Sequence, residues 1–214
     1  MGQHERHAED SLNISDEAAV LVGTWAVVPL IEAAQLARDA AAESANRVER
    51  ADPADGSGRA NSLADENRQT LVAILCAHAA IEAFTNQEGS VRDQARWEAD
   101  EAAKKQLVDK WCGLVERLSG AVPSQGQGAA QKLKMLDDER NSIAHYKGFK
   151  LPGGTRAFAS APTSTPDLGN ISGFRAYYRA GKANTAVATA WAVIESFYVA
   201  INDPLPEYLA ITRR

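Results

Sequence analysis

Apolar residues recur at helical spacing along almost the whole of this chain. The clearest case lies near the C-terminus, where the apolar positions fall three or four residues apart: Val187, Trp191, Ile194, Tyr198 and Ile201. This spacing places them on one face of an α-helix, which we expect over about 182–202, ending ahead of Pro204. Alternating patterns typical of strands are nearly absent. The chain is therefore predicted to pack helix against helix.

Capping and breaking signals predict four further helices. Ser15, followed by two acidic residues, is a typical N-cap, and we expect a bend or break near Pro29. Ser62 with Asp65, and Ser90 with Asp93, resemble capping boxes. Loop-forming residues fill 51–61 and 123–128. The four predicted helices cover about residues 15–50, 62–86, 90–118 and 129–147, the last of which Gly148 ends.

The segment 149–181 interrupts this pattern just before the last helix. It is rich in Gly, Pro, Ser and Thr, and its stretches FKLPGG and TRAFAS are expected to form a short hairpin. Loops of this length in a compact domain are usually functional or disordered. We therefore expect an all-α, antiparallel bundle of about five helices. It forms a single domain over 16–214 with a long loop insertion, after a disordered N-terminus at 1–15.

Composition and motifs exclude several function classes. The longest apolar stretch, AAVLVGTWAVVPLIEAA, spans roughly 17 residues, contains Pro29 and runs into a charged sequence, whereas a membrane span needs about 20 apolar residues. With no signal peptide in MGQHERHAEDSLN and two lone cysteines, Cys76 and Cys112, we expect a cytoplasmic protein with structural thiols and no membrane association. Phosphate-loop, dinucleotide, zinc-protease and serine-hydrolase motifs are missing, so we expect no cofactor and no metal.

The charge is distributed unevenly along the chain. The whole chain carries a net charge of −5, but residues 140–182 hold seven Lys and Arg against one Asp. A basic segment on an acidic body is what a phosphate-binding site would look like. A solvated loop with incidental charge is the alternative. The cations that would bind phosphate, and RNA if the chain proves to act on it, are Lys147, Lys150, Arg156, Arg175 and Arg179.

The stretch ERNSIAHYKG, at 139–148, carries the candidate chemistry. Arg140 interrupts an apolar face formed by Leu133, Leu136 and Ile143, where a guanidinium is costly unless it meets an anion or a partner. A histidine such as His145 can transfer protons near neutral pH, and an arginine can hold a phosphate. The alternative is a helix C-terminus whose histidine and lysine simply complement the helix dipole.

RNSIAH near the end of a helix resembles the signature of the HEPN superfamily, and AHAAIEAFTN at 77–86 is similar to a second segment of such proteins. The resemblance implies an antiparallel helical bundle that forms homodimers and often acts as a metal-independent endoribonuclease. Toxin–antitoxin, phage-defence and RNA-processing settings are typical, with RNA as substrate and an antitoxin or defence-complex protein as partner. Carried over by position, Arg140 and His145 would be catalytic and Asn141 auxiliary.

Two functional interpretations remain open at this point. One is the HEPN-type endoribonuclease, and the other is a catalytically inactive HEPN-like module for dimerisation or partner binding. On the second predicted helix, Glu82 shares a face with His78, and our hypothesis is that Glu82 positions Arg140. The alternative is a surface glutamate with no special partner. His78 itself is interpreted as a satisfied core or boundary histidine. The four tryptophans fall at core spacings and are assigned to packing.

Overall fold

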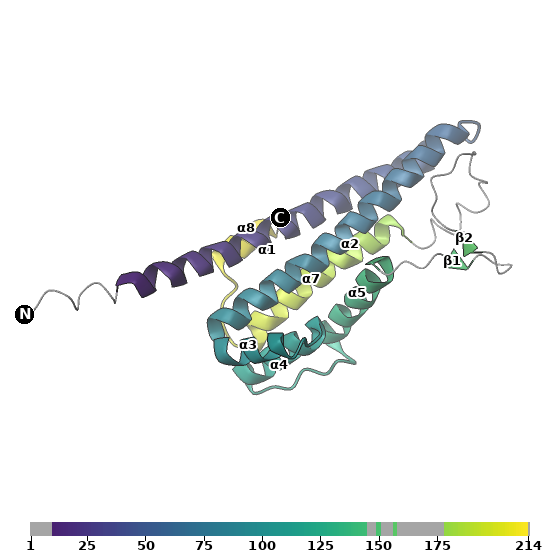
Figure 1. The fold of residues 1–214 in the computed structure, drawn as a ribbon. Coiled ribbons are helices and arrows are strands. Elements are labelled where there is room, and N and C mark those ends of the chain that lie inside the picture. The colour runs from purple at the N-terminus through teal and green to yellow at the C-terminus, as the bar shows by residue number, and fades with distance from the viewer. Residues whose placement is uncertain (1–9, 145–148, 151–155, 158–177, 214) are drawn as a thin grey trace, which may run out of the picture.

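The computed structural model describes residues 10–144, 149–150, 156–157 and 178–213, and these form a helical bundle (Figure 1). This confirms the predicted all-α fold with a loop before the last long helix. The helices of the described residues are α1 (Asp10–Arg50), α2 (Gly56–Arg92), α3 (Gln94–Ala102), α4 (Leu107–Ser119), α5 (Gly128–Ala144), α7 (Ala180–Ala200) and α8 (Glu207–Thr212).

A long antiparallel hairpin of α1 and α2 organises the bundle. Figure 1 shows α7 lying along this hairpin and α5 beside α7, while α3 and α4 close one end. The main core is formed between these helices, and its fully buried side chains include Ile31, Phe84, Leu114, Leu133 and Phe197. Phe84 and Phe197 meet edge to face with ring centroids 5.3 Å apart, which joins α2 to α7.

The first helix is longer than the sequence signals suggested, and Pro29 does not break it. It begins at Asp10, so the expected disorder at 1–15 is wrong for residues 10–15, and it continues through Pro29. A proline in a helix interior removes a backbone hydrogen bond and costs about 3 kcal/mol. Val27 and Ile31, on either side of Pro29, are fully buried. Their packing against the core offsets that cost and carries the helix past the proline.

The second helix begins at Gly56 rather than at the predicted Ser62. Asp55 caps it, because its Oδ1 accepts a hydrogen bond of 2.9 Å from the backbone N–H of Gly58. A Cβ on residue 58 would lie only 2.2 Å from Asp55 Oδ2, so glycine permits this cap. The helix then passes Ser90 and ends at Arg92. The capping-box expectations at Ser62 and Ser90 were therefore wrong in position.

The predicted third helix is two helices. The break between α3 and α4 falls at 103–106, where Lys104 adopts a positive φ of 52°. No glycine or proline marks this turn in the sequence, so composition did not reveal it. Lys105 Nζ lies 2.6 Å from the buried carboxylate of Asp100, which holds the turn against α3. The short C-terminal helix α8 was also not predicted.

The two ends of the loop insertion are fixed at one place in the bundle. Lys182 Nζ donates to Glu139 Oε1 at 2.7 Å, which ties the start of α7 to the end of α5. The backbone N–H of Ala180 donates to Glu66 Oε1 at 3.0 Å, which ties α7 to α2. Between them, the predicted hairpin is confirmed, because β1 (Phe149–Lys150) pairs antiparallel with β2 (Arg156–Ala157).

Aromatic and thiol side chains lie largely where the sequence placed them. Trp97, Trp111 and Trp191 are buried, as expected for packing residues, and the side chain of Trp25 lies outside the described part of the chain. Cys112 is buried and Cys76 is half-buried, both as free thiols. Within the described ranges, none of the helices combines the length and the apolar character needed to span a membrane.

Candidate functional site

Arg140 lies near the end of α5, on the helix face that packs into the bundle. Leu133 and Leu136 on the same face are buried, and Ile143 packs against the core. Arg140 is half-buried, because the apolar stripe reaches the edge of the core where the guanidinium stands. The predicted interruption of an apolar face by an arginine is therefore confirmed.

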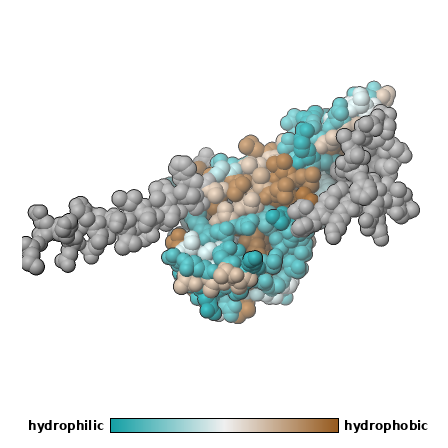
Figure 2. Space-filling model, viewed as in Figure 1, coloured by the Kyte–Doolittle hydropathy of each residue, from teal (hydrophilic) through white to brown (hydrophobic). Residues whose placement is uncertain are grey.

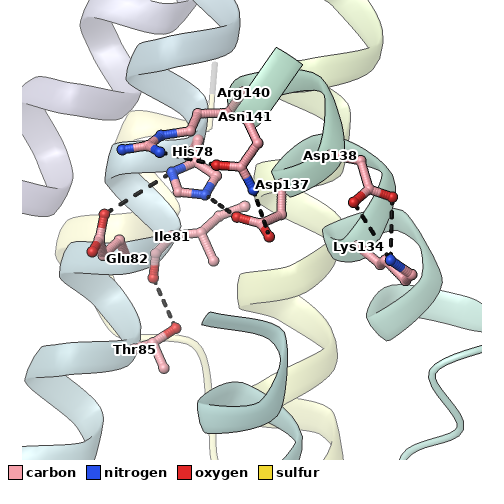
Figure 3. Close-up of polar contacts among 9 residues, drawn as sticks. All are labelled: His78, Ile81, Glu82, Thr85, Lys134, Asp137, Asp138, Arg140 and Asn141. Carbon is pink, nitrogen blue, oxygen red and sulfur yellow. Dashed lines mark hydrogen bonds and ion pairs between the residues drawn. The ribbon is translucent and has the colours of Figure 1, made fainter. Parts of the chain in front are cut away.

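A chain of polar contacts runs from this arginine across to α2 (Figure 3). Arg140 Nη1 donates to Asn141 Oδ1 at 3.0 Å, and Asn141 Nδ2 donates to Asp137 Oδ2 at 3.3 Å. The other carboxylate oxygen, Asp137 Oδ1, lies 2.8 Å from His78 Nε2. His78 Nδ1 in turn lies 4.0 Å from Glu82 Oε2. Five side chains from two helices thus form one connected polar cluster.

Burial is greatest in the middle of this cluster. The side chain of His78 is only 7% exposed and that of Asp137 is 16% exposed, whereas Glu82 is 52% exposed. Buried polar groups are stable only when they are hydrogen-bonded. The His78–Asp137 pair meets this requirement and joins α2 to α5. The interpretation of His78 as a satisfied core or boundary histidine is confirmed.

The carboxylate of Asp137 fixes the tautomer of the His78 ring. An ionised carboxylate only accepts hydrogen bonds, so the Nε2 atom facing Asp137 carries the proton. The Nδ1 atom then faces the carboxylate of Glu82 across 4.0 Å.

Glu82 belongs to the cluster through His78. In the described part of the chain its carboxylate is near the imidazole, while the guanidinium of Arg140 contacts the Asn141 amide. The expected action of Glu82 on Arg140 therefore has an indirect route, through His78, Asp137 and Asn141. That Glu82 positions Arg140 stays a prediction.

The electrostatic state of Arg140 follows from the group that holds it. An amide oxygen orients a guanidinium without neutralising it, whereas a carboxylate does both. Among the residues that the structure describes, Arg140 contacts no carboxylate, and Asp137 is separated from it by the Asn141 amide. The arrangement leaves a positioned positive charge at the edge of the bundle, which is suited to binding an anion such as phosphate.

The remaining predicted site residues are only partly described. His145, Lys147 and Arg175 lie outside the described residues. Lys150 and Arg156 stand opposite each other in the register of the β1–β2 pair. Arg179 is exposed at the N-cap of α7, one residue before the Ala180 amide that α2 binds.

Sequence reasoning missed Asp137. It lies one helical turn before Arg140 and Asn141, so its spacing to Asn141 would have allowed contact along the helix. Its contact with His78, however, joins residues 59 positions apart, and only the packing of α5 against α2 creates it. The adjacent Asp138, by contrast, faces outward and pairs with Lys134 at 3.2 Å.

No group of three or more His, Cys, Asp or Glu side chains that could hold a metal ion occurs in the described ranges. The side-chain cluster at Arg140 contains two carboxylates and one imidazole, but the imidazole and Asp137 are engaged with each other. No protein-family model matches the chain, and comparison with curated proteins and with solved structures finds no significant match either.

Proposed function

We propose that this chain is a HEPN-type, metal-independent endoribonuclease in which Arg140 binds the scissile phosphate and His145 transfers protons. The observation that carries the proposal is the half-buried guanidinium of Arg140, held by an amide at the end of α5. The described helix ends at Ala144, so His145 follows it directly in sequence. The similarity of RNSIAH to the HEPN signature supplies the reaction class.

The proposed reaction needs no group beyond these side chains and the RNA. His145 takes the proton of a ribose 2′-hydroxyl, and the 2′-oxygen attacks the adjacent phosphorus. The bond from phosphorus to the 5′-oxygen breaks, and the protonated His145 returns the proton, directly or through solvent water, to that leaving oxygen. The products are a 2′,3′-cyclic phosphate and a 5′-hydroxyl. Arg140 stabilises the negative charge that builds on the phosphoryl oxygens in the transition state.

Cleavage assays in EDTA test the proposal. Wild-type protein, Arg140→Ala and His145→Ala are incubated with structured and unstructured RNA. We expect each substitution to lower the cleavage rate by about 100-fold or more, the scale of losing one transition-state donor or a general base. Lys134→Ala is the matched control, because Lys134 is an exposed cation on the same helix.

The outcomes separate the two interpretations. Cleavage that survives both Arg140→Ala and His145→Ala contradicts the assignment of the site. Cyclic-phosphate ends that disappear in both variants but persist in Lys134→Ala support it. If wild-type protein cleaves none of the RNAs, the non-catalytic module becomes the better proposal.

A second candidate function, a HEPN-like module for self-association or partner binding, is favoured by an exposed apolar face. Leu36 on α1 is 71% exposed, and Val72 and Leu75 on α2 are 39% and 40% exposed. Figure 2 shows apolar residues gathered over this part of the α1–α2 hairpin. Large apolar patches on a protein surface often mark interaction sites. A homodimer through this face is compatible with either proposed function.

Sedimentation velocity tests the proposed dimer. We expect Leu36→Asp combined with Leu75→Asp to convert a dimeric wild-type protein to monomer. Val199→Asp is the control, because Val199 is 80% exposed at the end of α7. A wild-type protein that sediments as a monomer at all accessible concentrations would contradict self-association through the hairpin.

A further inference from the structure

The amide of Asn141 links two charged groups, and its orientation decides what it does to Arg140. Its Oδ1 accepts from Arg140 Nη1 at 3.0 Å, and its Nδ2 donates to Asp137 Oδ2 at 3.3 Å. An amide rotated by half a turn would present its NH₂ group to the guanidinium, donor against donor. Because an ionised carboxylate can only accept, Asp137 holds the amide in the orientation that binds the arginine.

Asp137 is itself held in place from the other helix. Its two carboxylate oxygens serve different partners, with Oδ1 2.8 Å from His78 Nε2 and Oδ2 3.3 Å from Asn141 Nδ2. His78 is almost fully buried on α2 and is one of the fixed points of the α2–α5 contact. The carboxylate therefore has a defined rotamer, and the direction it imposes on the amide originates in the bundle.

We propose that Asp137 is a positioning residue of the Arg140 phosphate site, acting through the Asn141 amide and fixed by His78. This proposal rests on the proposed function insofar as Arg140 binds the phosphate of RNA. It adds to that function the side chains that hold the guanidinium in place without neutralising it. Among the described residues Asp137 contacts His78 and Asn141, so it would act on Arg140 through the amide as a positioning residue and not as a catalytic one.

Whether removal of the Asp137 carboxylate weakens or strengthens RNA binding distinguishes a positioning role from a simple charge effect. Removing a carboxylate near an RNA site lowers repulsion and, by charge alone, strengthens RNA binding. If Asp137 positions Arg140, its removal instead weakens binding. Asp138, the next residue, provides the charge-only comparison, because its carboxylate is exposed and pairs with Lys134 at 3.2 Å.

The experiment measures binding of a 2′-O-methyl oligoribonucleotide, which lacks the attacking hydroxyl and cannot be cleaved. Affinity is measured at several salt concentrations for wild type, Asp137→Asn and Asp138→Asn, each alone and combined with Arg140→Ala. We expect Asp137→Asn to weaken binding about three- to tenfold, on the scale of one charge-assisted hydrogen bond. Asp138→Asn is expected to leave affinity unchanged or slightly increased.

The double variants test whether Asp137 acts through Arg140. A residue that works only through another loses its effect once that other residue is removed. In the Arg140→Ala background, Asp137→Asn should therefore cause no further loss of RNA affinity. As single variants, Asp137→Asn and Arg140→Ala should each lower the salt dependence of RNA binding by about one phosphate contact. An equal loss in both backgrounds would assign Asp137 a general structural role and overturn the proposal.

Other outcomes are equally decisive. Unchanged or tighter binding by Asp137→Asn, or unchanged binding by Arg140→Ala, overturns the proposal. If Asp137→Asn does not fold, Asn141→Ala replaces it, because this variant removes the amide and leaves the His78–Asp137 pair intact. The wild-type protein could also cleave no RNA while Asp137→Asn weakens binding only when Arg140 is present. That result would contradict the proposed reaction but support the positioning role of Asp137.

Discussion

Two arginines in this molecule stand in similar burial but in opposite electrostatic surroundings. Arg117 on α4 contacts Asp93 through its Nε, and its Nη1 lies 3.3 Å from Asp100 Oδ2. Arg140 on α5 is held by the amide of Asn141. Both guanidiniums are partly buried, yet the first is neutralised by two carboxylates and the second, among the described residues, by none.

The difference separates an arginine that holds the fold together from one that is presented to a ligand. Arg92 resembles Arg117, since it contacts Glu88 at 2.5 Å and Asp203 at 2.7 Å. Buried or half-buried cations with carboxylate partners have their charge satisfied within the protein. An oriented cation without such a partner still has charge to offer to an anion. This contrast is the physical basis for locating the candidate site at Arg140.

Replacing Asn141 with Asp would give Arg140 a carboxylate partner, as Arg117 has, and so remove the difference between the two arginines. A carboxylate at this position would pair with Arg140 and neutralise it, and it would also repel Asp137. We expect RNA cleavage to fall by about 100-fold, equivalent to about 2.7 kcal/mol of transition-state stabilisation. Single-turnover kinetics measure the loss. Ser142→Asp, which adds the same charge at the exposed neighbouring position, is the control. Equal losses in both variants would show a general charge effect.

Replacing Arg117, the arginine that two carboxylates neutralise, is expected to lower the stability of the fold. In Arg117→Ala the carboxylates of Asp93 and Asp100 lose a partner, and Asp100 is buried. We expect the free energy of unfolding to fall by about 2 kcal/mol, since an uncompensated buried charge is costly. Urea denaturation measures it. Arg96→Ala on α3, an exposed position, should change stability by less than about 0.5 kcal/mol. Similar losses of unfolding free energy in Arg117→Ala and Arg96→Ala would contradict the structural role assigned to Arg117.

The same ion-pair cluster predicts a pH dependence of stability. Burial raises the pKa of Asp100, but hydrogen bonds and charge from Lys105 and Arg117 outweigh this effect, so the pKa lies below the ordinary value of 3.8. A carboxyl with a lowered folded-state pKa stabilises the protein above its unfolded pKa, and this contribution is lost as the pH falls through the folded-state value. Wild type should therefore be more stable than Asp100→Asn near neutral pH, and the difference should shrink below about pH 4. Urea denaturation across pH measures it, and a difference constant with pH would contradict it.

The smallest effect is expected from the exposed pair on α5. Lys134 and Asp138 are more than half exposed and lie 3.2 Å apart at i, i+4. Such pairs contribute about 0.5 kcal/mol or less. Lys134→Ala should therefore leave unfolding free energy and RNA cleavage nearly unchanged, as thermal melting and cleavage assays would show. A large loss of cleavage would extend the site to the outer face of α5 and weaken the comparison with Arg117.

The sequence predicted much of the fold because its signals are local. The apolar stripe from Val187 to Ile201 marked the last long helix, and glycine- and proline-rich composition marked the loop before it. Helix boundaries were less predictable. Pro29 does not end α1, because Val27 and Ile31 pack into the core beside it. The turn at Lys104 has no local signature and depends on contacts made after α3 and α4 have packed.

By itself the sequence determined the helical class and placed Arg140 on the apolar face of its helix, with Asn141 on the adjoining face, since spacing along one helix fixes which side chains share a face. Only the tertiary structure decided that His78 and Asp137 meet, because this pair joins α2 and α5 across 59 residues of chain. That contact sets the orientation of the Asn141 amide and so the electrostatic state of the arginine. Local periodicity cannot encode it, since it arises from the packing of two helices.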